Sequence, residues 1–302
     1  MVFPLERIMK SAPENSFFST NQTLNIQGRL FDLTTPLVMA VLNVTPDSFY
    51  DGGRYQTESA ILNQVEKLLD EGATFIDVGA YSSRPGASDI SIEEESKRAL
   101  FALKTIIRNF PHALLSIDTF RSEVAYAAVN EGAAIVNDIS GGEQDPKMFD
   151  TVAGLGVPYI AMHMRGNPST MNKLTEYENL LTEMASYFQK KIYRMSQLGI
   201  KDVIIDPGFG FAKSIEQNYY VLSHLDYFRC LSKPMAVGLS RKSMIWKTLS
   251  INADSALNGT TSLNTIALMK GANILRVHDV KEAVEAIKLV SALRHNSKVM
   301  EH

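Results

Sequence analysis

Short apolar runs recur along the chain, and each follows a stretch whose apolar residues have helical spacing. The runs show no alternation of apolar and polar positions, which indicates strands covered on both faces, as in parallel sheets. Between residues 61 and 72, the apolar positions that share one helix face are Ile61, Leu62, Val65, Leu68 and Leu69. The pattern predicts repeated units of one strand and one helix.

A glycine marks the passage from each predicted helix to the next strand. The phrases "EGATFIDVGA" (71–80), "EGAAIVNDIS" (131–140) and "KGANILRVHD" (270–279) share one form, and "LGVPYIAMH" (155–163) and "LGIKDVIID" (198–206) are looser copies. Glycine suits a helix C-cap, where a left-handed backbone is needed. The spacing between the phrases is irregular, so they predict βα units and not a solenoid repeat.

Eight strands are predicted, at 37–42, 74–79, 113–117, 134–138, 158–162, 202–205, 235–239 and 273–277. Eight βα units over about 260 residues predict an α/β fold, a closed (β/α)8 TIM barrel. An open doubly wound sheet is the alternative, but it usually carries a G-x-G-x-x-G turn, and the sequence has none.

The flanking segments complete the predicted organisation. Residues 24–33 predict a hairpin before the first barrel strand, with its turn at Gly28-Arg29, placed to plug the N-terminal mouth of the barrel. We expect a flexible N-terminal arm over 1–20 and a single barrel domain over 21–302.

Composition narrows the classes of partner. The net charge of the 302 residues is −3 without a basic block, so nucleic acid and acidic membranes are not expected as main partners. The chain has one cysteine, which excludes an intrachain disulfide and fits a reducing compartment. We find no run of about 18 apolar residues and no signal-peptide pattern, and we predict a cytoplasmic protein.

Polar or charged side chains stand at the end of every predicted strand. The carboxyl ends of barrel strands meet at one face, where active sites are built. Asp138 and Ser140 also suit helix caps, but the acids of "LLSIDT" and "VIIDPG" adjoin β-branched runs, where an unpaired carboxylate is costly. Acids and amides suit a flat heterocycle that carries amino and N–H groups. Arg84, Lys242, Arg276 and His278 suit phosphate oxygens.

Eight motifs stand in order along the chain. They read "VMAVLNVTPDSFYDGG", "FIDVGAYSSRPGA", "LSIDTF", "VNDISGG", "MHMRGNPSTM", "IIDPGFGFAKS", "VGLSRKSMI" and "GTTSLNTIALMKGANILRVHDVKEA". From about Leu24 to the last helix, the chain resembles the dihydropteroate synthase family. The resemblance implies a TIM-barrel transferase of folate biosynthesis, usually a homodimer and a target of sulfonamides. Such an enzyme joins 6-hydroxymethyl-7,8-dihydropterin pyrophosphate to p-aminobenzoate and releases pyrophosphate, with Mg²⁺.

The resemblance also implies residue roles. The implied pterin pocket is Asp118, Asn137, Met162, Asp206, Phe211, Gly238 and Lys242. The implied pyrophosphate anchors are Asn43, Arg84, Arg276 and His278, with Mg²⁺ on Asn43. The implied p-aminobenzoate contacts are Ser82, Ser83, Arg84, Pro85, Lys242 and Ser243. The implied catalytic residues are Asp47, Asp118, Lys242 and Arg276.

Several alternatives stay open at this stage. A methyltetrahydrofolate-dependent methyltransferase of the same barrel family would share the acid and amide contacts to pterin. A non-catalytic pterin-binding paralogue is a second alternative. A further alternative is that Arg276 forms a surface ion pair with Asp279 or another acid. The chain also departs from the family pattern at Tyr50, Tyr81 and Ala212, where Ser, Glu and Gly are commoner.

Overall fold

The computed structural model describes residues 23–45, 54–81 and 89–300. Its first elements are the antiparallel strands β1 (Thr23–Ile26) and β2 (Arg29–Asp32). The turn between them is Gln27-Gly28, with φ of 51° and 80°. The predicted turn at Gly28-Arg29 was therefore wrong by one residue, because a two-residue hairpin turn of this kind needs positive φ at both central positions.

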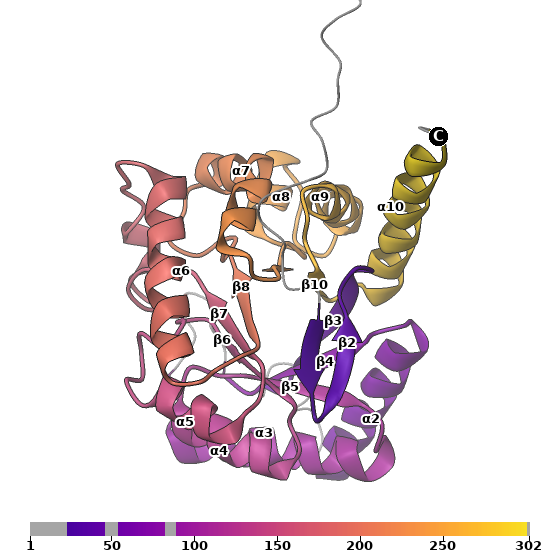
Figure 1. Ribbon diagram of the computed structural model, residues 1–302. Coiled ribbons are helices and arrows are strands. Elements are labelled where there is room, and N and C mark those ends of the chain that lie inside the picture. Colours follow the sequence, from indigo (N-terminus) through magenta and orange to yellow (C-terminus); the bar gives the residue numbers. More distant parts are fainter. Residues whose placement is uncertain (1–22, 46–53, 82–88, 301–302) are drawn as a thin grey trace, which may run out of the picture.

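Eight parallel strands follow the hairpin, and helices pack around their outside (Figure 1). The strands are β3 (Leu37–Asn43), β4 (Phe75–Gly79), β5 (Leu114–Asp118), β6 (Ile135–Asp138), β7 (Tyr159–Met162), β8 (Val203–Asp206), β9 (Ala236–Val237) and β10 (Ile274–Val277). They are hydrogen-bonded in the order β8-β7-β6-β5-β4-β3-β10-β9. A parallel bridge between Ile205 and Met235 joins the two ends, so the barrel closes as predicted.

The helices alternate with these strands along the chain. They are α2 (Arg54–Asp70), α3 (Ile92–Asn109), α4 (Ser122–Glu131), α5 (Met148–Leu155), α6 (Leu180–Gln197), α7 (Ile215–Ser223), α8 (Ser243–Thr248), α9 (Leu257–Met269) and α10 (Val280–Met300), with short 3₁₀ turns η1 (Met171–Lys173) and η2 (Leu225–Leu231). Polar residues fix several of the helix starts. Ser91 accepts from Glu94 N at the start of α3, and Ser214 with Gln217 forms a capping box on α7.

The five glycines of the recurring phrase behave as the sequence predicted. Their φ angles are all positive, from 66° to 121°, at Gly72, Gly132, Gly156, Gly199 and Gly271. Residues with a Cβ rarely adopt this backbone, so each glycine ends a helix and turns the chain into the next strand.

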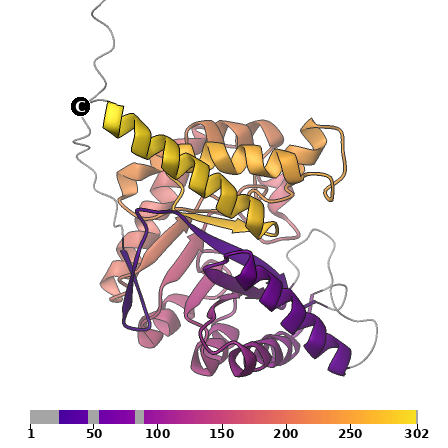
Figure 2. The same cartoon turned by 90° about the vertical axis from the view of Figure 1, so that its right-hand side faces the viewer.

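The lower end of the barrel is filled by apolar side chains. The first inward residues of the strands, among them Met39, Phe75 and Ile204, form one cluster with Leu24 and Ile26 of the hairpin. Figure 2 shows the hairpin lying across this end of the sheet. It therefore plugs the N-terminal mouth, as predicted, and the opposite end of the barrel is left to carry polar groups.

No helix within the described parts of the chain is both long and apolar enough to cross a membrane. The predicted arm over 1–20 lies outside the described residues.

Candidate active site

Side chains alternate along each strand, so every second residue points into the barrel. Above the apolar layer, these inward positions carry polar residues. Asp77 follows two residues after the inward Phe75, and Asp118 and Asp206 end β5 and β8. The register sets Asp118 beside Asn137 and Met162 beside Asp206 on neighbouring strands. The strand order therefore brings these groups together at the carboxyl end of the barrel.

These side chains enclose one cavity in the barrel mouth. Its lining residues are Asp118, Asn137, Ile139, Met162, Asp206, Phe209, Phe211, Gly238, Lys242 and Arg276. All the residues that the sequence implied for a pterin pocket are among them, together with Arg276. The sequence reasoning missed Ile139 and Phe209, which are apolar residues without a chemical signal of their own.

Arg276 lies at the centre of a part-buried ion-pair network: its side chain is 22% exposed, that of Asp118 is 19% exposed and that of Asp77 is fully buried. Its Nε donates to Asp77 Oδ2 at 2.7 Å, and its Nη2 donates to Asp118 Oδ2 at 2.6 Å. The amide Nδ2 of Asn137 donates to the same oxygen of Asp77 at 2.8 Å. The surface alternative for Arg276 is wrong, because Asp279 pairs with Arg241 instead.

Asp77 is the site residue whose importance the sequence reasoning did not recognise. Its carboxylate is fully buried, and its Oδ1 has no hydrogen-bond partner within the described residues. A buried carboxylate requires a cation. An acid at an inward position of one strand, with an arginine at an inward position of another, was the signal that would have predicted the pair.

The network also shifts the protonation of its members. Burial raises the pKa of Asp118 to about 7, while Arg276 opposes this shift and Asp77 adds to it. Burial acts to lower the pKa of Arg276, but its two carboxylate partners outweigh that effect and raise it. Arg276 is therefore a permanent cation that fixes the position of Asp118 in the cavity wall.

Asp206 is the second acid of the cavity and is 5% exposed. Its Oδ1 accepts from Gly208 N at 2.8 Å. Burial raises the pKa of Asp206, and this hydrogen bond and the positive charge of Lys242 act against the rise. No donor to its Oδ2 is found among the described residues, so that oxygen is available to a ligand.

Lys242 and Phe211 face each other in the same cavity. The Lys242 Nζ lies 4.5 Å from the centre of the Phe211 ring, within the range of a cation–π contact. Burial lowers the pKa of Lys242 to about 8, with Arg276 acting in the same direction. An ammonium group and an aromatic face thus share the space in which a flat ring is expected.

His278 lies beside this network and contacts Ser240. The His278 Nδ1 is 3.0 Å from Ser240 Oγ, and that Oγ accepts from the backbone N of His278 at 3.3 Å. The hydroxyl proton is therefore free to point to Nδ1, which leaves the ring proton on Nε2. Burial lowers the pKa of His278 to about 4, so the ring is neutral at pH 7 and acts as a hydrogen-bond donor, not a cation.

Two further predicted residues border the mouth. Asn43 ends β3, and its Oδ1 would lie 3.2 Å from a Cβ built on Gly79, close to Asp118. Ser243 begins α8 directly after Lys242. Mg²⁺ prefers one or two protein oxygens together with substrate phosphates, so the amide oxygen of Asn43 fits such a site. The described chain has no cluster of three or more acids, histidines or cysteines that would hold a metal alone.

The remaining predicted residues lie outside the described part of the chain. They are Asp47, Ser82, Ser83, Arg84 and Pro85. Tyr81, which departs from the family pattern, is described: its ring meets Phe120 edge-on at 5.1 Å, and Arg121 lies 5.3 Å from its centre. An aromatic contact and a cation thus replace the acid that is commoner at this position.

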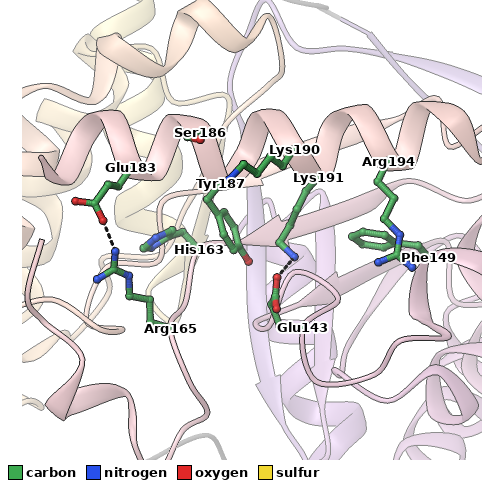
Figure 3. A pocket seen from close by; sticks show the side chains of 10 residues that line it. All are labelled: Glu143, Phe149, His163, Arg165, Glu183, Ser186, Tyr187, Lys190, Lys191 and Arg194. Atoms are coloured by element: carbon green, nitrogen blue, oxygen red, sulfur yellow. Dashed lines mark hydrogen bonds and ion pairs between the residues drawn. The ribbon is translucent and has the colours of Figure 1, made fainter. Parts of the chain in front are cut away.

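A second cavity lies on the outside of the barrel, along α6 (Figure 3). It measures about 520 Å³, against about 60 Å³ for the inner cavity. Its acids Glu143 and Glu183 are already paired with Lys191 and Arg165. Apart from His163, none of its lining residues stands at a strand end. The inner cavity is smaller, but its acids, amide and cations at the carboxyl end of the barrel identify it as the candidate active site.

Known proteins resemble this chain over most of its length. The family model described as "Pterin binding enzyme" matches residues 39–278. The dihydropteroate synthase of Escherichia coli strain K12 is 41% identical over 268 residues, which cover 88% of this chain and 94% of the relative.

Solved structures show the same likeness. A Yersinia pestis dihydropteroate synthase with a sulfonamide drug complex has a TM-score of 0.84 and 38% identity, covering 90% of this chain and 99% of the other. A Xanthomonas albilineans dihydropteroate synthase with 4-aminobenzoic acid has a TM-score of 0.84 and 36% identity, covering 91% and 99%. The chain belongs to the pterin-binding enzymes and, among them, to the dihydropteroate synthase family of transferases.

Proposed function

We propose that the chain joins 6-hydroxymethyl-7,8-dihydropterin pyrophosphate to p-aminobenzoate, giving 7,8-dihydropteroate and pyrophosphate. The observation that carries this proposal is the inner cavity. Its lining combines acids and an amide with two phenylalanines and two cations. The structure of a relative with 4-aminobenzoic acid supports the second substrate.

The cavity suits the pterin ring by its hydrogen-bonding groups. Asp206 would accept from the pterin amino and ring N–H groups, and Lys242 would donate to its carbonyl side. Asn137 donates its Nδ2 to Asp77, which fixes the amide and leaves Oδ1 as an acceptor for the ligand. Phe211 and Met162 would line the faces of the ring, and Gly238 leaves room beside Arg276.

The pyrophosphate would lie at the mouth against the remaining donors. Arg276 supplies a permanent positive charge, and neutral His278 supplies an N–H. Arg84 is proposed as a third anchor. Asn43 would hold Mg²⁺, which when bound would neutralise charge on the leaving pyrophosphate.

The bond between the pterin methylene and the pyrophosphate oxygen would break first, and the electron pair would leave with pyrophosphate. The methylene that remains is cationic and conjugated with the ring. The carboxylate of Asp118, held by Arg276 at 2.6 Å, would stabilise that charge, and Asp47 is proposed to assist. The aniline nitrogen then forms the new C–N bond and loses one proton, and no dedicated base is required.

The p-aminobenzoate would enter last. We propose Lys242 and Ser243 as one side of its site and Ser82, Ser83, Arg84 and Pro85 as the other. A substrate site next to the cationic methylene places the aniline nitrogen for attack and displaces water that would compete.

A pyrophosphate-release assay tests this function directly. The pterin pyrophosphate is incubated with and without p-aminobenzoate, and dihydropteroate is identified by mass. We expect release that depends on p-aminobenzoate and yields dihydropteroate. A methyltransferase would instead consume methyltetrahydrofolate, and a non-catalytic paralogue would bind pterin without turnover, so either result would overturn the proposal.

We also propose a homodimer. Large apolar side chains are exposed on α7, on η2, on α9 and in the segment that follows α8. They are Tyr220, Tyr227, Leu249, Ile251, Leu257, Ile266 and Met269. Such apolar surface suits burial against a second copy. Sedimentation equilibrium is expected to give twice the chain mass of 33.5 kDa. A monomer at micromolar concentration would refute this proposal.

The compartment is a separate proposal. The single cysteine fits a reducing environment, and on that ground we propose the cytoplasm.

A further inference from the structure

Lys213 is a buried lysine behind the wall of the inner cavity, and the mechanism above gives it no role. The residue is 8% exposed. Its Nζ donates to the backbone oxygens of Gly208 and Phe211, both at 3.1 Å. A third contact joins Nζ to His163 Nδ1 at 3.0 Å. The ammonium group thus uses all three of its donors inside the protein.

The segment that Lys213 holds is the loop between β8 and α7. This loop carries Phe209 and Phe211 into the cavity wall. Its backbone is left-handed at Gly208, Gly210 and Ala212, with φ of 69°, 81° and 48°. Such a backbone forms no regular helix or strand, and one hydrogen bond inside the loop runs from Phe211 N to Gly208 O at 3.1 Å, so further donors to its carbonyl oxygens come from outside the loop. Lys213 supplies them for two residues of the loop.

His163 links the same ammonium group to the neighbouring strand. It follows Met162 at the end of β7 and is 2% exposed. An ammonium only donates, so Nδ1 of His163 is the acceptor and its proton lies on Nε2. The backbone N of His163 also donates to Asp206 O at 2.9 Å. The contact therefore connects two strand ends that both line the cavity.

The position of Lys213 has a cost in stability. Burial lowers its pKa to about 7, with Asp206 opposing the shift and Arg165 and Lys242 adding to it. An apolar side chain of similar length would avoid the cost of burying an ammonium group. The charge of Lys213 is therefore better explained by the loop and the His163 ring that it holds in place than by a gain in the stability of the fold.

We propose that Lys213 is a positioning residue for the pterin. Together with His163, it clamps the loop 207–212 against the end of β7 and so holds Asp206 and Phe211 at the cavity. The inference rests on the proposed function, since it takes the ligand of this cavity to be the pterin.

Steady-state kinetics of Lys213→Met test the clamp. Met is one atom shorter than Lys, removes the three donors and avoids the buried charge, so the variant is expected to fold. We expect the KM for the pterin pyrophosphate to rise at least about tenfold, and the KM for p-aminobenzoate at saturating pterin to change less than about twofold. The control Lys201→Met changes an exposed lysine at the other end of β8 and is expected to match wild type.

The two substrates separate positioning from general destabilisation. A variant that is merely less stable would lose active enzyme, so kcat would fall while both KM values stayed at the wild-type level. Circular dichroism at the assay temperature checks that Lys213→Met is folded. A folded Lys213→Met with the wild-type pterin KM would overturn the inference.

A matched pair at His163 provides an independent test, and it decides the matter if Lys213→Met does not fold. His163→Asn keeps an acceptor oxygen near the place of Nδ1, whereas His163→Leu removes it. We expect His163→Leu to raise the pterin KM about threefold or more and His163→Asn to stay closer to wild type. Equal effects of both variants would contradict the clamp. A wild-type protein without dihydropteroate formation would instead overturn the proposed function, and the inference with it.

Discussion

Replacing Arg276 by Met tests the buried ion pair that organises the barrel mouth. Met has a flexible unbranched side chain and no charge, so it fills much of the space of Arg without serving Asp77. In wild type, Asp77 Oδ2 receives Arg276 Nε at 2.7 Å, and the carboxylate has no contact with solvent. The substitution leaves this acid with Asn137 as its remaining hydrogen-bond donor within the described residues.

The expected loss follows from that isolation. Removing one partner of a buried ion pair typically costs about 3–5 kcal/mol, because the other charge stays buried without compensation. Domains are commonly stable by about 5–15 kcal/mol, so Arg276→Met should fold but lose a large part of its stability. Asp77→Asn removes the stranded charge. The double variant is therefore expected to lose less than the sum of the two single losses, by about 1 kcal/mol or more.

Urea unfolding followed by the fluorescence of Trp246, the single tryptophan, measures these free energies. The control is Arg108→Met, which breaks the exposed pair with Glu58 and should cost less than about 0.5–1 kcal/mol. The reasoning is refuted if Arg276→Met loses no more than the control, or if the effects of Arg276→Met and Asp77→Asn are additive.

Three further predictions follow from the same geometry. His278 has a pKa of about 4 in the folded chain and of about 6.5 in the unfolded chain. Between these values the unfolded chain binds more protons, so the contribution of His278 to the free energy of unfolding is lost as pH falls. Since Gln does not titrate, urea unfolding should show His278→Gln gaining about 1–2 kcal/mol relative to wild type between pH 7.5 and pH 5, and no relative gain would reject the buried neutral ring. Gly208→Ala would bring a Cβ to 2.2 Å from His163 O, whereas Gly156 has a similar positive φ and open space around its Cβ position. Gly208→Ala should therefore lower the free energy of unfolding in urea by at least about 2 kcal/mol more than Gly156→Ala does. Equal losses would show that this close approach is not rigid. Finally, calorimetry should find that p-aminobenzoate binds at least about tenfold more tightly after pterin and Mg·pyrophosphate are added, whereas equal affinity would mean that its site does not depend on them.

The barrel was predictable because its signals are local and repeated. Each unit carries an apolar run, a helical face and a glycine, and the five glycines of the phrase adopt the positive φ that the pattern required. The meeting of acids and an amide in the barrel mouth was predictable because they lie at strand ends, and strand ends of a closed barrel meet by topology. Their assignment to a pterin pocket came from the family resemblance and stays a prediction. The turn of the hairpin was missed by one residue because Gln27 adopts positive φ without being glycine.

The pairings inside the mouth were not predictable in the same way. Asp77 and Arg276 are separated by nearly the whole barrel in sequence, and they meet because β10 pairs with β3, the neighbour of β4. The sequence reasoning gave Arg276 roles in pyrophosphate binding and in catalysis, but it did not predict that Arg276 also pairs with Asp77 and Asp118. His278 was expected as a pyrophosphate anchor beside Arg276, and the structure adds that burial lowers its pKa and makes the ring neutral. Burial depends on packing that no short motif reveals.

Ala212 shows how one departure from the family pattern acts physically. Its φ of 48° explains why glycine is commoner there, since a left-handed backbone strains residues that have a Cβ. In this chain the Tyr177 hydroxyl donates to Ala212 O at 2.8 Å, and this contact helps to hold the strained position.

The central claim is that the inner cavity holds the pterin through Asp206, and calorimetry with the pterin substrate tests it most directly. Asp206→Asn keeps the shape of the side chain but replaces an acceptor with a donor, so we predict a loss of about 1–3 kcal/mol, or roughly 5- to 150-fold in Kd. The control Asp226→Asn changes an exposed acid that pairs with Lys270 and should bind like wild type. Wild-type affinity in Asp206→Asn would contradict the account.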